Sequence, residues 1–136
     1  MSAALAGGCH CGALRFTFET ARRLAPRACQ CGFCRRHGAR SVSDRQGRAD
    51  LWLGAAAHFY RFATASTDYV LCGRCGVYLG AVAEIGGTPY ATLNLNAFDD
   101  PRLDLEAVPV SYGGETVQEK AARRLRAWTP ATLHKG

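Results

Sequence analysis

The chain has 136 residues, a formal net charge of +6 and seven cysteines. This length is typical of one domain, so we expect residues 1–136 to fold as a single unit. The ordinary composition, 48% apolar and 21% charged, excludes a disordered chain, a collagen and a coiled coil. The sequence shows neither an apolar run of membrane-helix length nor a basic signal-like N-terminus, so we expect a cytoplasmic protein without a membrane partner.

Short strands separated by glycine, proline and aspartate dominate the pattern. The expected strands, in chain order, cover residues 14–19, 58–62, 68–71, 77–85, 90–96 and 108–112. Gly86 and Gly87 suit a hairpin turn, and the run Asp99-Asp100-Pro101 suits another turn. We therefore expect a mainly β fold of antiparallel sheets.

Two helices are expected in addition. The first is a single turn at 34–38, and the second covers 115–128, where Glu115 provides an acidic start and arginines a basic end. Four apolar residues recur in the second helix at helical spacing, namely Val117, Ala121, Leu125 and Trp128. Pro130 is expected to end this helix.

The cysteines are clustered, and none stands alone. Because seven is odd, disulfides do not account for all of them, and about five per cent cysteine is below the level of a disulfide scaffold. In a reducing compartment, clustered cysteines are typically metal ligands or catalytic groups. The three groups are Cys9 and Cys11; Cys29, Cys31 and Cys34; and Cys72 and Cys75.

Two of these groups predict one structural zinc site. The run Cys72-Gly73-Arg74-Cys75-Gly76 has the form of a zinc knuckle, and Cys9 and Cys11 would present both sulfurs to one side of an extended chain. Four thiolates complete the tetrahedral set of a structural zinc. The alternatives are buried, uncoordinated cysteines and a ligand role for His10, which an extended chain would point away from the two sulfurs.

The remaining group predicts a second zinc site with catalytic residues Cys29, Cys31 and Cys34. A turn at Gly32 would bring the third thiol to the other two. Three protein ligands are typical of a catalytic zinc, which keeps its fourth position for water or substrate. A carboxylate or His37 is the alternative fourth ligand. Three thiolates make zinc a poorer activator of water, so the set favours thiol chemistry over hydrolysis.

The cysteine motifs resemble those of the glutathione-dependent formaldehyde-activating family, whose fold also occurs in centromere protein V. Residues 7–16, 29–36 and 72–77 are similar to its three cysteine motifs, and 95–101 more loosely to a later segment. The resemblance implies a zinc-binding β-tent of coiled antiparallel sheets over core motifs at 7–101. It implies a structural zinc on Cys9, Cys11, Cys72 and Cys75, and a catalytic zinc on Cys29, Cys31 and Cys34.

The resemblance also implies a reaction, which none of the patterns above indicates. It is that of a carbon–sulfur lyase-type enzyme, which joins formaldehyde and glutathione reversibly to give S-hydroxymethylglutathione. The expected partner is accordingly glutathione or another small thiol.

Arginines supply almost all of the positive charge, fifteen against two lysines. Arg35 and Arg36 follow the second cluster, where they would stabilise thiolates, hold a substrate carboxylate or simply be exposed. A further basic group lies near the C-terminus, namely Lys120, Arg123, Arg124 and Arg126. The alternative function is therefore a non-catalytic two-zinc module whose arginine-rich surface binds nucleic acid or another anion.

The charge of the metal sites weakens this alternative. Seven thiolates would subtract seven charges and two zinc ions would add four, so the charge of +6 would fall to about +3. We therefore expect no nucleic-acid partner. Two variations stay open: both zinc ions are structural, or the thiolates take up iron or cadmium instead.

Overall fold

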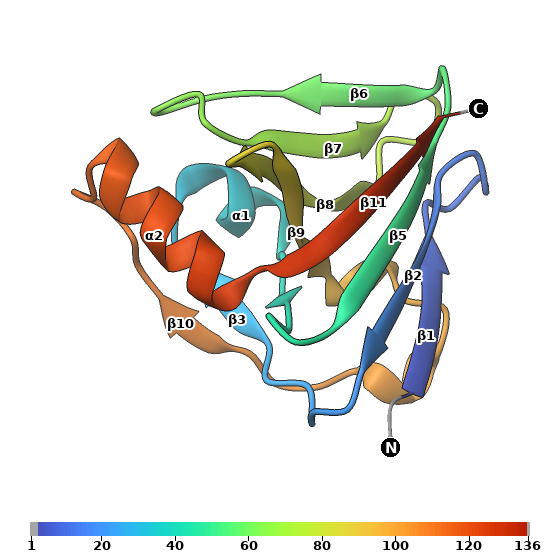
Figure 1. Cartoon of the computed structure of the whole chain (residues 1–136). Coiled ribbons are helices and arrows are strands. Elements are labelled where there is room, and N and C mark those ends of the chain that lie inside the picture. Colours follow the sequence, from blue (N-terminus) through green and yellow to red (C-terminus); the bar gives the residue numbers. More distant parts are fainter. Residues whose placement is uncertain (1–2, 136) are drawn as a thin grey trace.

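The structure, a computed structural model, describes residues 3–135 (Figure 1). Eleven strands in this part of the chain form one sheet, so the expected mainly β fold is confirmed. The strands are β1 (Ala3–Gly8), β2 (Arg15–Thr20), β3 (Arg27–Cys29), β4 (Ser41–Val42), β5 (Arg48–Leu53), β6 (Ala57–Tyr60), β7 (Asp68–Cys72), β8 (Tyr78–Ile85), β9 (Thr88–Asn94), β10 (Val108–Val110) and β11 (Thr129–Lys135). The helices are α1 (Gly32–His37) and α2 (Val117–Ala127), with short 3-10 turns η1 (Leu95–Ala97) and η2 (Pro101–Leu103).

The strands follow the order β1-β2-β5-β11-β9-β4-β3-β10, and β8, β7 and β6 branch from β9. Most pairs are antiparallel, as expected, but β11 runs parallel to β5 and β10 runs parallel to β3. The sheet is therefore mixed. The sheet is curved, and α1 and α2 both lie near its β3 and β10 end (Figure 1).

The main core forms where alternating strand residues turn inward. Phe16 and Phe18 of β2 are fully buried, and the ring of Phe98 meets each of them edge-on at 4.9 and 6.1 Å between centroids. The same cluster of buried residues includes Cys9 and Cys72. The core thus fixes the two chain segments that carry the first and third cysteine groups.

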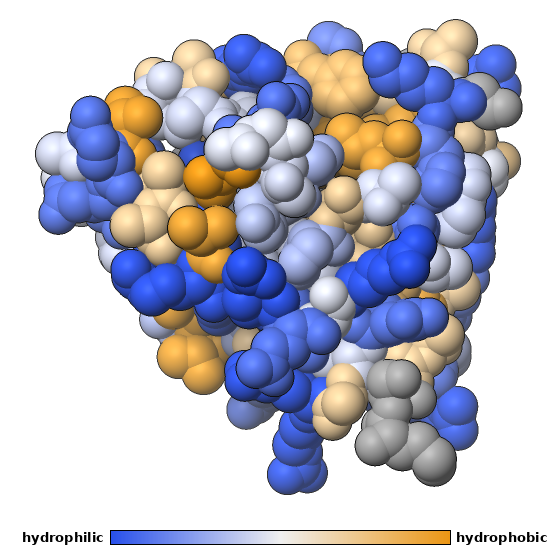
Figure 2. Space-filling model, in the orientation of Figure 1, coloured by the Kyte–Doolittle hydropathy of each residue, from blue (hydrophilic) through white to orange (hydrophobic). Residues whose placement is uncertain are grey.

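The C-terminal part of the chain differs from expectation in two ways. The helix ends at Ala127, before Pro130, but the chain then continues as a strand that was not expected, β11, in which Pro130 lies opposite Tyr90 of β9. In α2, Val117 and Leu125 are 49% and 40% exposed, whereas Arg124 is buried. The buried face of the helix is therefore not the apolar face that the spacing indicated. Hydrophobic and hydrophilic residues alternate on the surface where α2 lies (Figure 2).

A capping box begins α2. The Thr116 side chain accepts a hydrogen bond from the backbone N–H of Glu119, whose carboxylate accepts one from the backbone N–H of Thr116. The helix ends at Ala127, and Trp128 directly after it is buried against Ala81, Ala83 and Tyr90 of the sheet. Among residues 3–135, neither helix is long and apolar enough to cross a membrane.

Candidate metal centres and the cavity beside them

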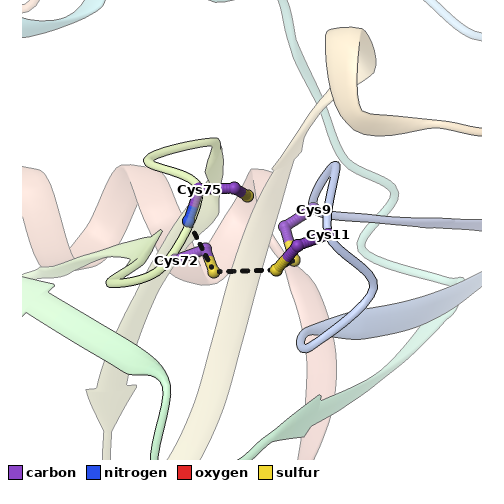
Figure 3. Close-up of side chains that lie close together, drawn as sticks. All are labelled: Cys9, Cys11, Cys72 and Cys75. Atoms are coloured by element: carbon purple, nitrogen blue, oxygen red, sulfur yellow. Dashed lines mark hydrogen bonds between the residues drawn. The ribbon is translucent and has the colours of Figure 1, made fainter.

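Four cysteines from two loops meet at one point (Figure 3). Cys9 and Cys11 lie in the turn between β1 and β2, and Cys72 and Cys75 lie at the turn between β7 and β8. Their sulfur atoms all lie within 4.8 Å of one another. The expected set of four is thus brought together, although a turn, and not an extended strand, aims Cys9 and Cys11 at the same point.

The spacing of these sulfurs fits zinc. The Sγ atoms of Cys9 and Cys11 are 3.7 Å apart, and those of Cys11 and Cys72 are 3.6 Å apart. A Zn–S bond of about 2.3 Å in a tetrahedron requires sulfurs about 3.8 Å apart, whereas a disulfide requires about 2.05 Å. His10 is exposed and does not belong to the cluster.

Backbone N–H groups point at these sulfurs and favour their thiolate form. Leu14 N–H donates to Cys9 Sγ at 3.2 Å, and the N–H of Cys75 donates to Cys72 Sγ at 3.4 Å. The N–H of Cys75 is the largest effect that lowers the pKa of Cys72, and the N–H of Val77 leads the effects that lower the pKa of Cys75 to about 6. The knuckle turn depends on Gly76, whose φ of +82° is accessible mainly to glycine.

The second cluster consists of Cys29, Cys31 and Cys34, again with sulfurs within 4.8 Å of one another. Cys29 ends β3, Cys31 is the N-cap of α1, and Cys34 lies in the first turns of that helix. The N–H of Cys34 donates to Cys31 Sγ at 3.4 Å. The helix that begins at Gly32 therefore turns the third thiol toward the other two, as the sequence predicted.

The thiols of Cys29 and Cys34 differ in how readily they lose a proton. A hydrogen bond from the Cys34 thiol is the main effect that lowers the pKa of Cys29 to about 5, while the same bond and burial raise the pKa of Cys34. Such a group binds one proton tightly and gives up another readily. Three sulfurs this close together are suited to binding a metal ion.

Within the described residues, neither a carboxylate nor a histidine joins this cluster. The ring of His37 packs against Phe33 at 4.4 Å and Tyr78 at 5.5 Å between centroids. Phe33 also contacts Tyr60, Phe62 and Tyr69. His37 is thus part of an aromatic cluster beside the thiols and is not a fourth ligand.

A cavity of about 330 Å³ opens beside this cluster. Cys29 and Cys31 form part of its wall, and other walls come from the loop at 62–67, the loop at 111–113 and α2. Tyr69 also lines it, and burial is the largest effect that raises the pKa of its phenol, so the phenol stays protonated. The cationic side chains that line the cavity are Lys120, Arg123 and Arg124 of α2.

Arg35 and Arg36 do not line this cavity. They are exposed and donate to the nearby backbone oxygens of Gln30 and Gly32. The cationic wall comes instead from the basic group near the C-terminus. Sequence reasoning noted that group without connecting it to the cysteines, because only the fold brings α2 beside Cys29.

A mainly β fold with two separate cysteine clusters defines a class of small proteins suited to metal binding. The family of glutathione-dependent formaldehyde-activating enzymes matches residues 4–111, and the chain belongs to this family. The fold is also similar to the crystal structure of a Rhodobacter sphaeroides protein, with 29% sequence identity and a TM-score of 0.62. That match covers 79% of this chain and 100% of the other.

Proposed function

We propose that the protein is a zinc-dependent carbon–sulfur lyase-type enzyme that adds a thiol reversibly to an aldehyde, with formaldehyde and glutathione as the expected pair. The observation that carries this proposal is the cluster of three thiols at the wall of a cavity. Membership of a family whose named members are enzymes supports it.

The residues divide into two roles in this proposal. Cys9, Cys11, Cys72 and Cys75 hold a structural zinc that joins two hairpin loops. Cys29, Cys31 and Cys34 would hold the second zinc beside the cavity, where the ion would bind a substrate thiol. Zinc at this site would lower the pKa of a substrate thiol, so that the sulfur reacts as a thiolate at neutral pH.

The chain's own contribution is to bring the two reactants together. In the forward direction the thiol S–H adds across the C=O bond: a carbon–sulfur bond forms, and the proton goes to the aldehyde oxygen. The reverse step breaks that bond and returns the proton to sulfur. The cavity holds the thiol beside Cys29 and Cys31, and its aromatic walls, Phe62 and Tyr69, exclude part of the water that would hydrate the aldehyde.

The alternative function, a nucleic-acid module, receives less support from the surface. Several of the arginines already pair with carboxylates, including Arg15, Arg40, Arg61, Arg102 and Arg123. Non-specific binding to nucleic acid depends on contacts between protein cations and phosphates. Arginines that are paired with carboxylates have less charge available for such contacts.

Exchange NMR on the zinc-loaded protein tests the proposed reaction. It measures the rate at which formaldehyde and glutathione interconvert with their adduct, above the spontaneous rate without protein. We expect acceleration by the wild type and none by Cys34→Ser that still holds the structural zinc. A wild-type rate equal to the spontaneous rate, with two zinc ions bound, would rule out this substrate pair.

A further inference from the structure

The cavity beside the three thiols has a strongly basic wall that lies outside the family match. The match ends at residue 111, and α2 begins at Val117. Lys120, Arg123 and Arg124 of this helix line the cavity, and none of the described residues that line it is acidic. The feature therefore belongs to this chain and is not explained by the family alone.

Arg124 is the most deeply buried of these cations. It is only 6% exposed, and none of the carboxylates in the described chain pairs with it. Its Nη1 donates to the Ser66 hydroxyl at 2.9 Å, and its guanidinium lies 4.9 Å from the centroid of Trp128. Its Nε is buried and has no acceptor.

A second orphaned polar atom lies at the same cavity. In residues 3–135, the buried side-chain nitrogen and oxygen atoms without a hydrogen-bond partner are Arg124 Nε and Thr67 Oγ1. Both residues line this cavity. Buried polar groups are normally paired, and a buried cation without a partner is costly. The cavity wall thus carries two polar residues whose buried hydrogen-bonding capacity is not fully used, and one of them is a cation.

Arg123 and Lys120 differ in how much of their charge is free to bind an anionic ligand. Arg123 is already paired with Glu115 at 3.0 Å, and its guanidinium lies 3.5 Å above the ring of Tyr112. Lys120 is half-buried and has no ion pair within the described chain. The charge that remains for a ligand is thus that of Arg124 and Lys120. A guanidinium matches the planar fork of a carboxylate.

We propose that Arg124, assisted by Lys120, binds a carboxylate of the thiol substrate and that α2 thereby makes the protein selective for thiols that carry one. The thiol end lies toward Cys29 and Cys31, and the carboxylate end lies toward α2. The inference rests on the proposed function for the thiol end, whereas the anion subsite at Arg124 is testable without it.

Three probes separate the two ends. They are 3-mercaptopropionate, its methyl ester, which keeps the thiol without the charge, and 3-(methylthio)propionate, which keeps the charge without a free thiol. Calorimetric titration into the zinc-loaded protein measures each affinity, so the readout does not depend on turnover. We expect the acid to bind at least about tenfold more tightly than its ester.

The variants identify the residue responsible. Arg124→Met replaces the buried cation with an apolar side chain of similar length, and we expect it to abolish the preference for the acid. Lys120→Met should reduce that preference about threefold, and Arg124→Lys should restore part of what Arg124→Met loses. Arg126→Met, on an exposed position of the same helix, is the matched control and should change nothing. Zinc content and circular dichroism verify that each variant folds.

The outcomes are distinguishable. Equal binding of acid and ester by the wild type overturns the inference, even where turnover is normal. Equal loss of both ligands in Arg124→Met also overturns it, since Arg124 would then only balance the charge of the thiolates. If the thioether acid binds as tightly as the thiol acid, and turnover is absent, the anion subsite stands and the proposed function fails.

Discussion

The guanidinium of Arg15 and the carboxylate of Asp99 form a two-point ion pair between segments 84 residues apart. Arg15 belongs to the first cysteine motif, and Asp99 follows η1. The neighbouring guanidinium lowers the pKa of Asp99. The pair thus holds the end of the turn that carries Cys9 and Cys11 against the segment after β9.

We expect this ion pair to contribute little to stability, because both side chains are about half exposed. A double-mutant cycle with Arg15→Met and Asp99→Asn, followed by urea unfolding at pH 7, should give a coupling energy below about 1 kcal/mol. The coupling should shrink further in 1 M salt. A larger coupling energy that does not change in 1 M salt would show that the pair lies in a desolvated environment.

Substitution of one cysteine in each cluster, which removes its metal ion, should distinguish the structural site from the second site. We expect two zinc ions per chain by elemental analysis, one in Cys34→Ser, and a folded Cys34→Ser protein. Cys72→Ser should melt far below the wild type, since a structural zinc supplies on the order of 10 kcal/mol of apparent binding energy. A Cys72→Ser variant as stable as Cys34→Ser would contradict the division into a structural and a second site.

Close backbone packing at Gly7 should make it intolerant of a side chain. A Cβ there would collide with the carbonyl oxygen of Ala97 and with the ring of Phe16. Gly7→Ala is therefore expected to cost about 1–3 kcal/mol in denaturant unfolding. Gly54→Ala, where a Cβ meets open space, is the control and should fall within about 0.5 kcal/mol of wild type.

Leu125 and Trp128 both belong to the expected apolar spacing, but substitutions at the two positions should differ strongly in their cost to stability. Leu125 is 40% exposed, so Leu125→Gln should change the free energy of unfolding by less than about 0.5 kcal/mol. Trp128 is buried against the sheet, and Trp128→Ala should cost about 3–5 kcal/mol. Thermal unfolding of the two variants provides the comparison. A large cost for both variants would mean that the apolar spacing in the sequence, and not the observed packing, describes this segment.

The cysteine clusters could be predicted because their members lie close together in sequence. Cysteines a few residues apart must lie close together in any fold. The division into one site of four thiols and one of three could therefore be predicted from the number of ligands that zinc prefers. The turn at Gly32 brings Cys34 to its partners as expected, whereas Cys9 and Cys11 meet through a turn and not through the expected extended chain. The extent of the domain, residues 1–136, and the catalytic role of Cys29, Cys31 and Cys34 stay predictions.

The missed features depend on contacts between distant segments. β5 is an exception, because its buried apolar residues alternate with Arg48 and Asp50, and this period-two pattern could have identified the strand. β11 contains a proline and polar residues, and it is a strand because β5 and β9 provide partners on both sides. Arg124 lies four residues before Trp128, and this helical spacing is the one sequence signal that could have placed it on the buried face.

The position of β11 also governs the order in which the sheet can be completed during synthesis. It lies between β5 and β9, both of which leave the ribosome earlier. Until β11 emerges, β5 has one unpaired edge, and β9 lacks a partner on that side at Tyr90 and Ala91. Such edges are templates for pairing with another chain, so a chain truncated before residue 129 should aggregate more readily than the full chain.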